Sequence, residues 1–294
     1  MSSRRRPQNL SPRPSRPAAG TTPSSPGARR HRTARRPAAR SSRWIALPPA
    51  VDLAKLTAVD LKSMAAAGRE IHECYRVLAK TGDNIVGEAL RDQDTFYEWT
   101  HYPRDDVYDD VTHAQFYYHA HPAGERAWAE HGHFHAFLRP RGMPSGVRPA
   151  DVPPPSEPAD PATPEADNAA LSHLVAISMN PAGLPIRLFT TNRWVTGETW
   201  YAAADVCAML DRFLIDHTRP SWALNRWISA MFRLFRPQMI ALVHARDRAV
   251  AQWQRQSDAA PVIYDDRSRD VASTIEIDVD EQIARVAAEL ARRI

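Results

Sequence analysis

Cysteine is scarce in this 294-residue chain, in which Cys74 and Cys207 are the only two. Two cysteines so far apart in sequence provide neither a disulfide framework nor a Cys-x-x-Cys metal or redox motif. Long apolar runs are also missing, because Arg233 and Arg236 interrupt even the apolar segment 228–243, and a membrane-spanning helix needs roughly 18 consecutive apolar residues. We therefore expect a cytoplasmic protein without a membrane span.

Lysine is rare in this chain, so nearly all of its basic residues are arginines, and many of these lie in the N-terminal segment. Residues 1–43 hold twelve arginines and no Asp, Glu or Lys, which leaves 26 basic and 34 acidic side chains in the rest of the chain. This segment has almost no large apolar side chain, so ordering it would cost backbone entropy without hydrophobic compensation. We predict a disordered Arg/Pro-rich tail, which is either an arm for nucleic acid or the product of a start site assigned too far upstream.

Several common enzyme fingerprints are missing as well. The chain contains no Gly-x-Ser-x-Gly elbow, no P-loop, no Gly-x-Gly-x-x-Gly and no His-Glu-x-x-His. These absences argue against the usual serine hydrolases, nucleotide-binding folds and zinc proteases. No apolar segment follows the first arginines either, so we expect no secretory signal.

Hydrophobic spacing predicts most helices and strands. A helix is expected over 57–80, with Thr57 as its N-cap, followed by a short helix over 85–90 and a short strand over 95–100. Further helices are expected over 200–215, after a cap at Thr196-Gly197-Glu198, and from Ser221 onward, with Pro237 dividing the second one. A hairpin over 171–179 and 184–191, a strand over 271–277 and a helix over 279–293 complete the prediction.

Nine prolines lie within 140–168, together with several acidic residues, which favours an extended solvated loop. A lone hairpin is marginally stable in water, so the strands that follow this loop should join a sheet that begins before it. We therefore predict one α+β domain over 57–294, in which several helices pack on an antiparallel or mixed sheet. The Pro-rich segment is expected to be a disordered insertion.

Seven of the twelve histidines fall within 35 residues, between His101 and His135. In a strand over 112–121, His113, His119 and His121 share one face with Gln115 and Tyr117, while the apolar residues take the other. A helix would scatter the same histidines around its circumference. The segment 131–139 divides in the same way, so two strands each present a His-x-His pair.

Paired strands of this kind would bring several imidazoles together. Alternate residues of a strand project side by side, and imidazoles at that spacing can converge on one ion. Nearby carboxylates such as Glu130 would complete the site, which suits zinc or iron. The candidate metal ligands are His113, His119, His121, His131, His133 and His135. The alternative is a solvent-exposed sheet face whose histidines simply hydrogen-bond their neighbours.

Weaker signals lie elsewhere in the chain. Asn192, Arg193 and Glu198 concentrate hydrogen-bonding groups where a strand gives way to a helix, so they are candidates for ligand binding, with turn and capping roles as the alternative. His173 alternates with Val175 and Ile177, which indicates a core histidine. The remaining helical histidines, among them His72 and His244, are expected to be ordinary.

The segments His-Ala-Gln-Phe-Tyr-Tyr-His-Ala-His, beginning at His113, and Glu-His-Gly-His-Phe-His, beginning at Glu130, resemble an uncharacterised bacterial domain family of unknown function. The segment 188–201 adds to this resemblance, which covers about residue 57 to the C-terminus. The resemblance implies no activity, cofactor or substrate.

Three functions are consistent with the sequence. The first is a metal-binding protein, with a metal-dependent hydrolase or oxygenase acting on an unknown small molecule as the enzyme classes. The second is a non-enzymatic ligand-binding or scaffold domain, and the third is association with nucleic acid through the basic tail. Convergence of His119, His121, His133 and His135 would favour the first. The sequence leaves the oligomeric state open.

Overall fold

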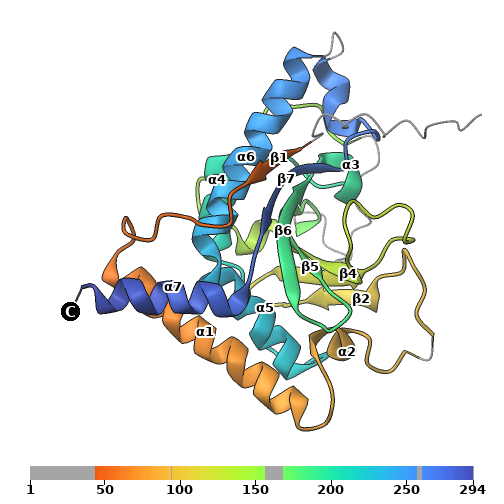
Figure 1. Cartoon of the computed structure of the whole chain (residues 1–294). Coiled ribbons are helices and arrows are strands. Elements are labelled where there is room, and N and C mark those ends of the chain that lie inside the picture. The colour runs from red at the N-terminus through yellow and green to blue at the C-terminus, as the bar shows by residue number, and fades with distance from the viewer. Residues whose placement is uncertain (1–43, 94, 156–167, 257–259, 294) are drawn as a thin grey trace, which may run out of the picture. The chain divides into compact units, whose positions relative to one another are not determined.

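The computed structural model describes residues 44–93, 95–155, 168–256 and 260–293 (Figure 1). The tail over 1–43 and the middle of the Pro-rich insertion, 156–167, lie outside the described residues. The predictions made for those two segments therefore stay predictions.

One mixed, seven-stranded sheet organises the described part of the chain, with the strand order β1-β7-β6-β5-β4-β3-β2. Only β1 and β7 pair in parallel, and the other neighbours are antiparallel. The strands are β1 (Ile45–Leu47), β2 (Tyr102–Tyr108), β3 (Ala114–His119), β4 (Gly132–Leu138), β5 (Ser172–Met179), β6 (Pro185–Thr191) and β7 (Val271–Glu276).

Helices alternate irregularly with these strands, so the described fold is α+β, as the sequence predicts. They are α1 (Ala58–Ala79), α2 (Ile85–Ala89), α3 (Arg193–Thr196), α4 (Ala203–Leu210), α5 (Trp222–Leu234), α6 (Arg236–Arg255) and α7 (Val279–Ala291). None of the described helices is both long enough and apolar enough to cross a membrane.

Local sequence explains where the long helices begin. The Thr57 side chain accepts a hydrogen bond from the backbone N–H of Asp60, whose carboxylate accepts one from the backbone N–H of Thr57, so α1 starts with a capping box. Ser221 caps α5 by accepting from the N–H of Leu224. Pro237 cannot donate a backbone hydrogen bond, and the helical segment divides just before it, between α5 and α6.

Two predicted elements were wrong. Residues 95–100 form irregular backbone with one turn at 98–99, and the strand lies further on, in β2, where polar residues obscure the apolar alternation. The helix predicted over 200–215 is shorter, because α4 covers only Ala203–Leu210. The expected cap at Thr196-Gly197-Glu198 is instead the end of the short helix α3, where Gly197 takes a left-handed conformation (φ 62°).

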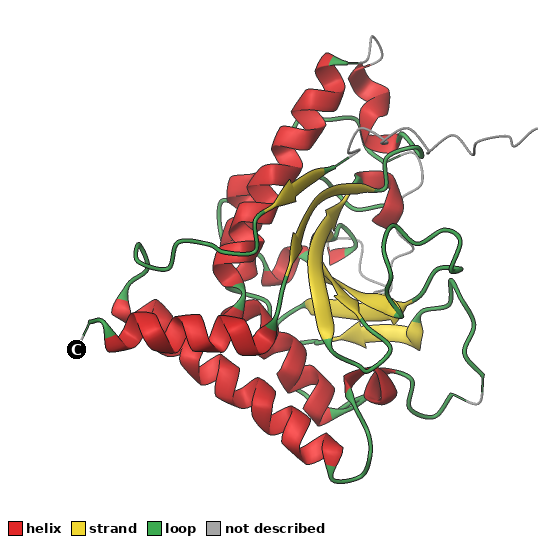
Figure 2. Cartoon of the chain, in the orientation of Figure 1, coloured by secondary structure: helices red, strands yellow, loops and turns green. Residues whose placement is uncertain are grey.

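The two faces of the sheet have different neighbours. On the apolar face, α4 and α6 contact the strands directly, and Trp227 of α5 packs against Phe134 of β4 with ring centroids 5.5 Å apart. Next in turn, α1 packs on α5 and α7 on α1. Figure 2 shows the long helices gathered on one side of the strands, with loops on the other. The histidines of β3 and β4 lie on the loop-covered face.

The strands that precede and follow the Pro-rich insertion share this sheet. β4 pairs along its length with β5, and β5 continues through a tight turn into β6. The prediction that the halves share one core is therefore confirmed. The described flanks of the insertion are packed: Val147 lies against the main core, and Pro149 bridges to Tyr201.

Candidate metal centre

The register between β3 and β4 brings the predicted histidine faces together. His119 pairs directly with His133, and Tyr117 pairs with His135, so three imidazoles from two strands project from the same face. The two strands alternate as predicted, with Phe116 and Phe134 in the core on the opposite face.

Three of these imidazoles converge closely enough to share an ion. One ring nitrogen each from His119, His133 and His135 lies within 4.8 Å of the others. The Nε2 atoms of His119 and His133 are 2.8 Å apart. The Nε2 atom of His135 is buried and has no hydrogen-bond partner among the described residues. A buried polar nitrogen is seldom left without a partner unless an ion or a water binds it.

A carboxylate orients His133 from behind. Glu130 Oε1 lies 2.8 Å from His133 Nδ1, and its other oxygen accepts hydrogen bonds from the Trp128 indole, at 3.0 Å, and from the Ser178 hydroxyl. Burial opposes ionisation of Glu130, but these hydrogen bonds outweigh it and hold its pKa below the ordinary value. This contact fixes the orientation of the His133 ring, with Nδ1 toward Glu130 and Nε2 toward His119.

His173 orients His135 in a similar way. The His135 Nδ1 and His173 Nε2 atoms are 3.0 Å apart, and His173 Nδ1 is 3.2 Å from the Thr191 hydroxyl. The expectation that His173 shares a face with Val175 was wrong. A bulge shifts the β4–β5 register, so that Ala136 pairs with Val175 but Phe137 pairs with His173. The bulge rotates His173 onto the histidine face.

The histidine face is buried, whereas the sequence suggested a solvent-exposed one. His119, His133 and His135 are 7%, 3% and 1% exposed. The segment that joins β3 to β4 folds back over them, with Trp128 packing against Phe189 at a centroid distance of 5.1 Å. Burial, reinforced by the neighbouring His133, lowers the pKa of both His119 and His135 well below 6.5. Both imidazoles are therefore neutral at physiological pH, as metal ligation requires.

His121 lies at the edge of this cluster, half-buried and stacked on Trp99. Its ring centroid is 4.9 Å from that of His119 and 5.1 Å from that of His133. Burial and the neighbouring His133 lower its pKa to about 4. His121 is therefore close enough to act as a further ligand or to face a ligand of the ion.

Two other candidate ligands lie apart from the cluster. His113 occupies the turn before β3, where its Nδ1 is 2.5 Å from the hydroxyl of Tyr108. His131 precedes β4, and its Nδ1 is 2.5 Å from the hydroxyl of Tyr118, a residue of the apolar face. The prediction assumed that the alternation of the strand extends to His131. It does not, because β4 begins only at Gly132.

A small crevice reaches the cluster from the surface. It has a volume of about 40 Å³ and is lined by His121, Glu130, His133 and His135, among others. One water needs roughly 10–15 Å³ of such volume. The crevice therefore has room for an ion and a very small ligand.

The weaker candidates around α3 have structural partners. Asn192 caps α3 and donates to the Ile263 carbonyl, while the buried Arg193 guanidinium forms an ion pair with Asp265 at 2.8 Å. Glu198 is different, because it is fully buried and only one of its oxygens has a partner, the backbone N–H of His173. Burial raises the pKa of Glu198 to about 8, and the nearby Arg246 opposes this rise.

Several supporting residues could not be assigned from the sequence. Trp128, Ser178 and Thr191 lie far apart in sequence and meet the histidines only through strand pairing and a folded-back loop. The alternation of residues in β5 predicts that Ser178 and Ala176 lie on the same face of the sheet. Because of the bulge, the same alternation does not predict that His173 also lies on that face.

This arrangement is a buried, histidine-rich face on the mixed sheet of an α+β fold. The chain belongs to the family described as "Domain of unknown function (DUF6969)", whose model matches residues 65–277. The resemblance to an uncharacterised family is thereby confirmed, and it brings no activity with it. No curated protein and no solved structure matches the chain.

Proposed function

We propose that the protein binds one divalent transition metal ion through the Nε2 atoms of His119, His133 and His135. The observation that carries this proposal is the convergence of three buried imidazoles, one of which has an Nε2 atom without a partner among the described residues. Carboxylate–histidine pairs such as Glu130–His133 orient ligands in many metal sites.

The donor set favours zinc and then iron. Glu130 contacts His133 on the side away from the cluster, so the converging atoms are three imidazole nitrogens and no carboxylate oxygen. Three histidines with an open position are typical of catalytic zinc sites, whereas iron oxygenases commonly use two histidines and one carboxylate. A metal-dependent hydrolase is therefore the enzyme class we favour, with an oxygenase second.

Elemental analysis of the full chain, after removal of any purification tag, tests this proposal. We expect about one zinc or iron per chain at neutral pH, and loss of that metal in His133→Asn and in His119→Asn. His244→Asn, on the exposed side of α6, is the matched control and should retain the metal. Circular dichroism of each variant separates metal loss from unfolding.

A non-enzymatic ligand-binding domain is the second candidate. It is favoured by the 2.8 Å separation of the His119 and His133 Nε2 atoms, which is also an ordinary hydrogen-bond distance. Wild-type protein that is folded but binds neither zinc nor iron stoichiometrically would support this candidate and rule out the metal site.

A further inference from the structure

A chamber of about 470 Å³ opens on the histidine face, beside the candidate metal centre. Its volume lies within the usual range for pockets that bind small molecules. Residues from the edge strand β2, from β3 and β4, and from α3 line it, among them His101, Tyr117, Phe137 and Thr196.

Two of these lining residues touch the proposed metal ligands. The ring centroid of Tyr117 is 5.4 Å from that of His119 and 5.2 Å from that of His135. His101 stacks on Tyr117 and lies 5.7 Å from His119. Val195 lines both this chamber and the crevice that reaches His133 and His135. A molecule held in the chamber therefore lies beside Tyr117 and His101, which contact His119 and, through Tyr117, His135.

Two residues that line the chamber, Tyr117 and Thr196, have hydroxyls without a hydrogen-bond partner among the described residues. Tyr117 is 6% exposed, and its hydroxyl has no hydrogen bond to the described residues. Thr196 is 9% exposed, and its hydroxyl is buried without a partner in the same part of the chain. A buried hydroxyl without a partner costs free energy. Both hydroxyls thus lack an internal partner, which a hydrogen bond to a ligand would supply.

The Asp106 carboxylate, which lines the chamber, already has hydrogen-bond partners. It lies 3.0 Å from His101 Nδ1 and accepts a 2.7 Å hydrogen bond from Gln115, which in turn accepts one from Arg139. Arg104 and Asp105, of opposite charge, also line the chamber, and both are exposed. Burying an unpaired charge in the inner chamber would be costly, so its occupant should be uncharged there.

We propose that this chamber binds a small uncharged polyhydroxylated compound of monosaccharide size and presents it to the metal site. Hydroxyl groups of the compound would exchange hydrogen bonds with Tyr117 and Thr196, and its apolar face would pack on Phe137, Leu171 and Val195. This assignment rests on the proposed metal site for its catalytic meaning, but ligand binding can be measured independently.

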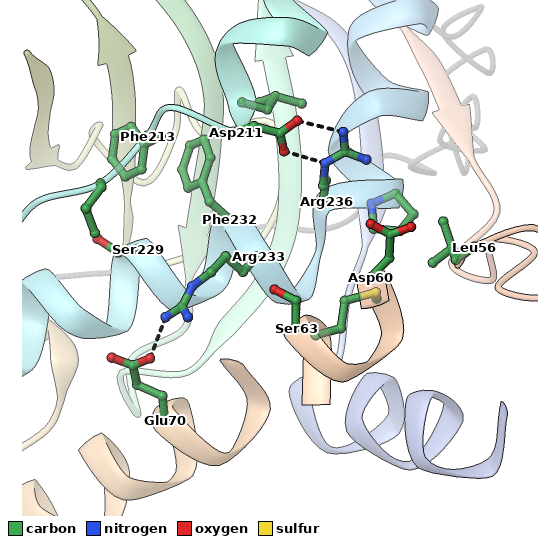
Figure 3. A pocket seen from close by; sticks show the side chains of 14 residues that line it. Leu56, Asp60, Ser63, Glu70, Asp211, Phe213, Ser229, Phe232, Arg233 and Arg236 are labelled. Carbon is green, nitrogen blue, oxygen red and sulfur yellow. Dashed lines mark hydrogen bonds and ion pairs between the residues drawn. The ribbon is translucent and has the colours of Figure 1, made fainter. Parts of the chain in front are cut away.

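Another hollow, of about 680 Å³, has no buried hydroxyl without a partner among the described residues that line it (Figure 3). It lies between α1, the end of α4 and the junction of α5 with α6. Both arginines that line this hollow form ion pairs: Arg233 pairs with Glu70, and Arg236 pairs with Asp211 at 2.5 Å. The chamber on the histidine face is therefore the better candidate for a substrate site.

Saturation-transfer NMR and calorimetry on the metal-loaded full chain test the proposal. The probes are D-glucose, D-xylose, D-ribose and myo-inositol, with succinate and putrescine as charged comparators. We expect at least one of the four uncharged probes to bind, with affinity about threefold to tenfold weaker in Tyr117→Phe and in Thr196→Val, each of which removes one hydroxyl. Tyr97→Phe, an exposed tyrosine outside the chamber, is the control and should not change binding.

The proposal is overturned if none of the four probes binds, if only succinate or putrescine binds, or if both hydroxyl deletions leave the affinity unchanged. Metal content is measured on the same samples. Protein without metal that still binds an uncharged probe, with the expected loss in both variants, would contradict the proposed metal function and leave the chamber assignment standing.

Discussion

At the residue scale, Glu130 is the group most closely tied to the histidine cluster without joining it. The residue is 7% exposed, and its carboxylate contacts His133 Nδ1 and accepts hydrogen bonds from Trp128 and Ser178. Outer partners of this kind fix the orientation of a ligand and raise its basicity. Glu130 is therefore a positioning residue in the proposed site.

We expect Glu130→Gln to bind zinc about tenfold to a hundredfold more weakly than the wild type, because the neutral amide orients and polarises His133 less effectively. Competition with a chromophoric chelator measures this affinity. Glu73→Gln, at an exposed position of α1, provides the control. Equal zinc affinities for Glu130→Gln and the wild type would show that Glu130 only fills space.

Glu198 allows a pH-dependent prediction. Its pKa is raised from 4.5 to about 8, so between these values the folded protein keeps a proton that the unfolded chain releases. The free energy of unfolding should therefore fall as pH rises from 4.5 to about 8, by at most about 1.4 kcal/mol per pH unit, and level off above that range. The Glu198→Gln variant has a neutral amide that does not titrate in this range, so this contribution to the pH dependence of stability is absent from it.

Urea unfolding between pH 5 and 9 compares the two proteins. The difference in stability between Glu198→Gln and the wild type should grow in favour of the variant as pH rises toward 8. The exposed Glu276→Gln should follow the wild type. A constant difference across the whole range would mean that Glu198 is ionised in the folded protein throughout.

At the element scale, the sequence predicts the histidine strands well because their alternation is regular. The apolar and polar sets of β3 and β4 separate cleanly, and their pairing brings His119 and His133 opposite each other. Alternation fails where the backbone departs from a regular strand. The bulge in β5 moves His173 to the other face, and the irregular, polar β2 shows no apolar pattern. Burial of the cluster depends on a loop, which no periodicity describes.

Close approach of β3 and β4 depends on Gly132. A Cβ atom at this position would lie 2.5 Å from the backbone oxygen of His119 and 2.6 Å from the hydroxyl of Tyr118. Both distances are shorter than van der Waals contact, and the first involves backbone that cannot move alone. The glycine therefore lets the strands approach at the residues that carry the histidines.

We expect Gly132→Ala to lower the melting temperature by several degrees and to reduce metal content, because the strands must separate beside His119 and His133. Differential scanning calorimetry and elemental analysis measure the two effects. Gly124→Ala is a matched control, since a Cβ atom there meets nothing within 4 Å. Equal behaviour of the two variants would contradict the close packing of β3 on β4.

At the scale of the whole molecule, the histidine cluster proposed to bind metal depends on both halves of the chain. The three proposed ligands precede the Pro-rich insertion, whereas Ser178, His173 and Thr191, which hydrogen-bond Glu130, His135 and His173 in turn, follow it. The long pairing of β4 with β5 joins the two sets. The sequence predicts that strands before and after the insertion share one sheet, and this pairing is what brings the two sets of residues together.

Cutting the chain within 156–167 tests this dependence. We expect the fragments 1–161 and 162–294, when co-expressed, to copurify, because the β4–β5 ladder and the helix contacts hold them together without a covalent link. The pair of fragments should bind metal. Fragment 1–161 alone contains all three proposed ligands but should not bind metal, because it lacks β5, which pairs with β4 and carries the residues that orient the ligands. Stoichiometric metal on fragment 1–161 alone would show that β3 and β4 form the site by themselves. Failure of the fragments to associate would show that the covalent link between β4 and β5 is needed to assemble the sheet.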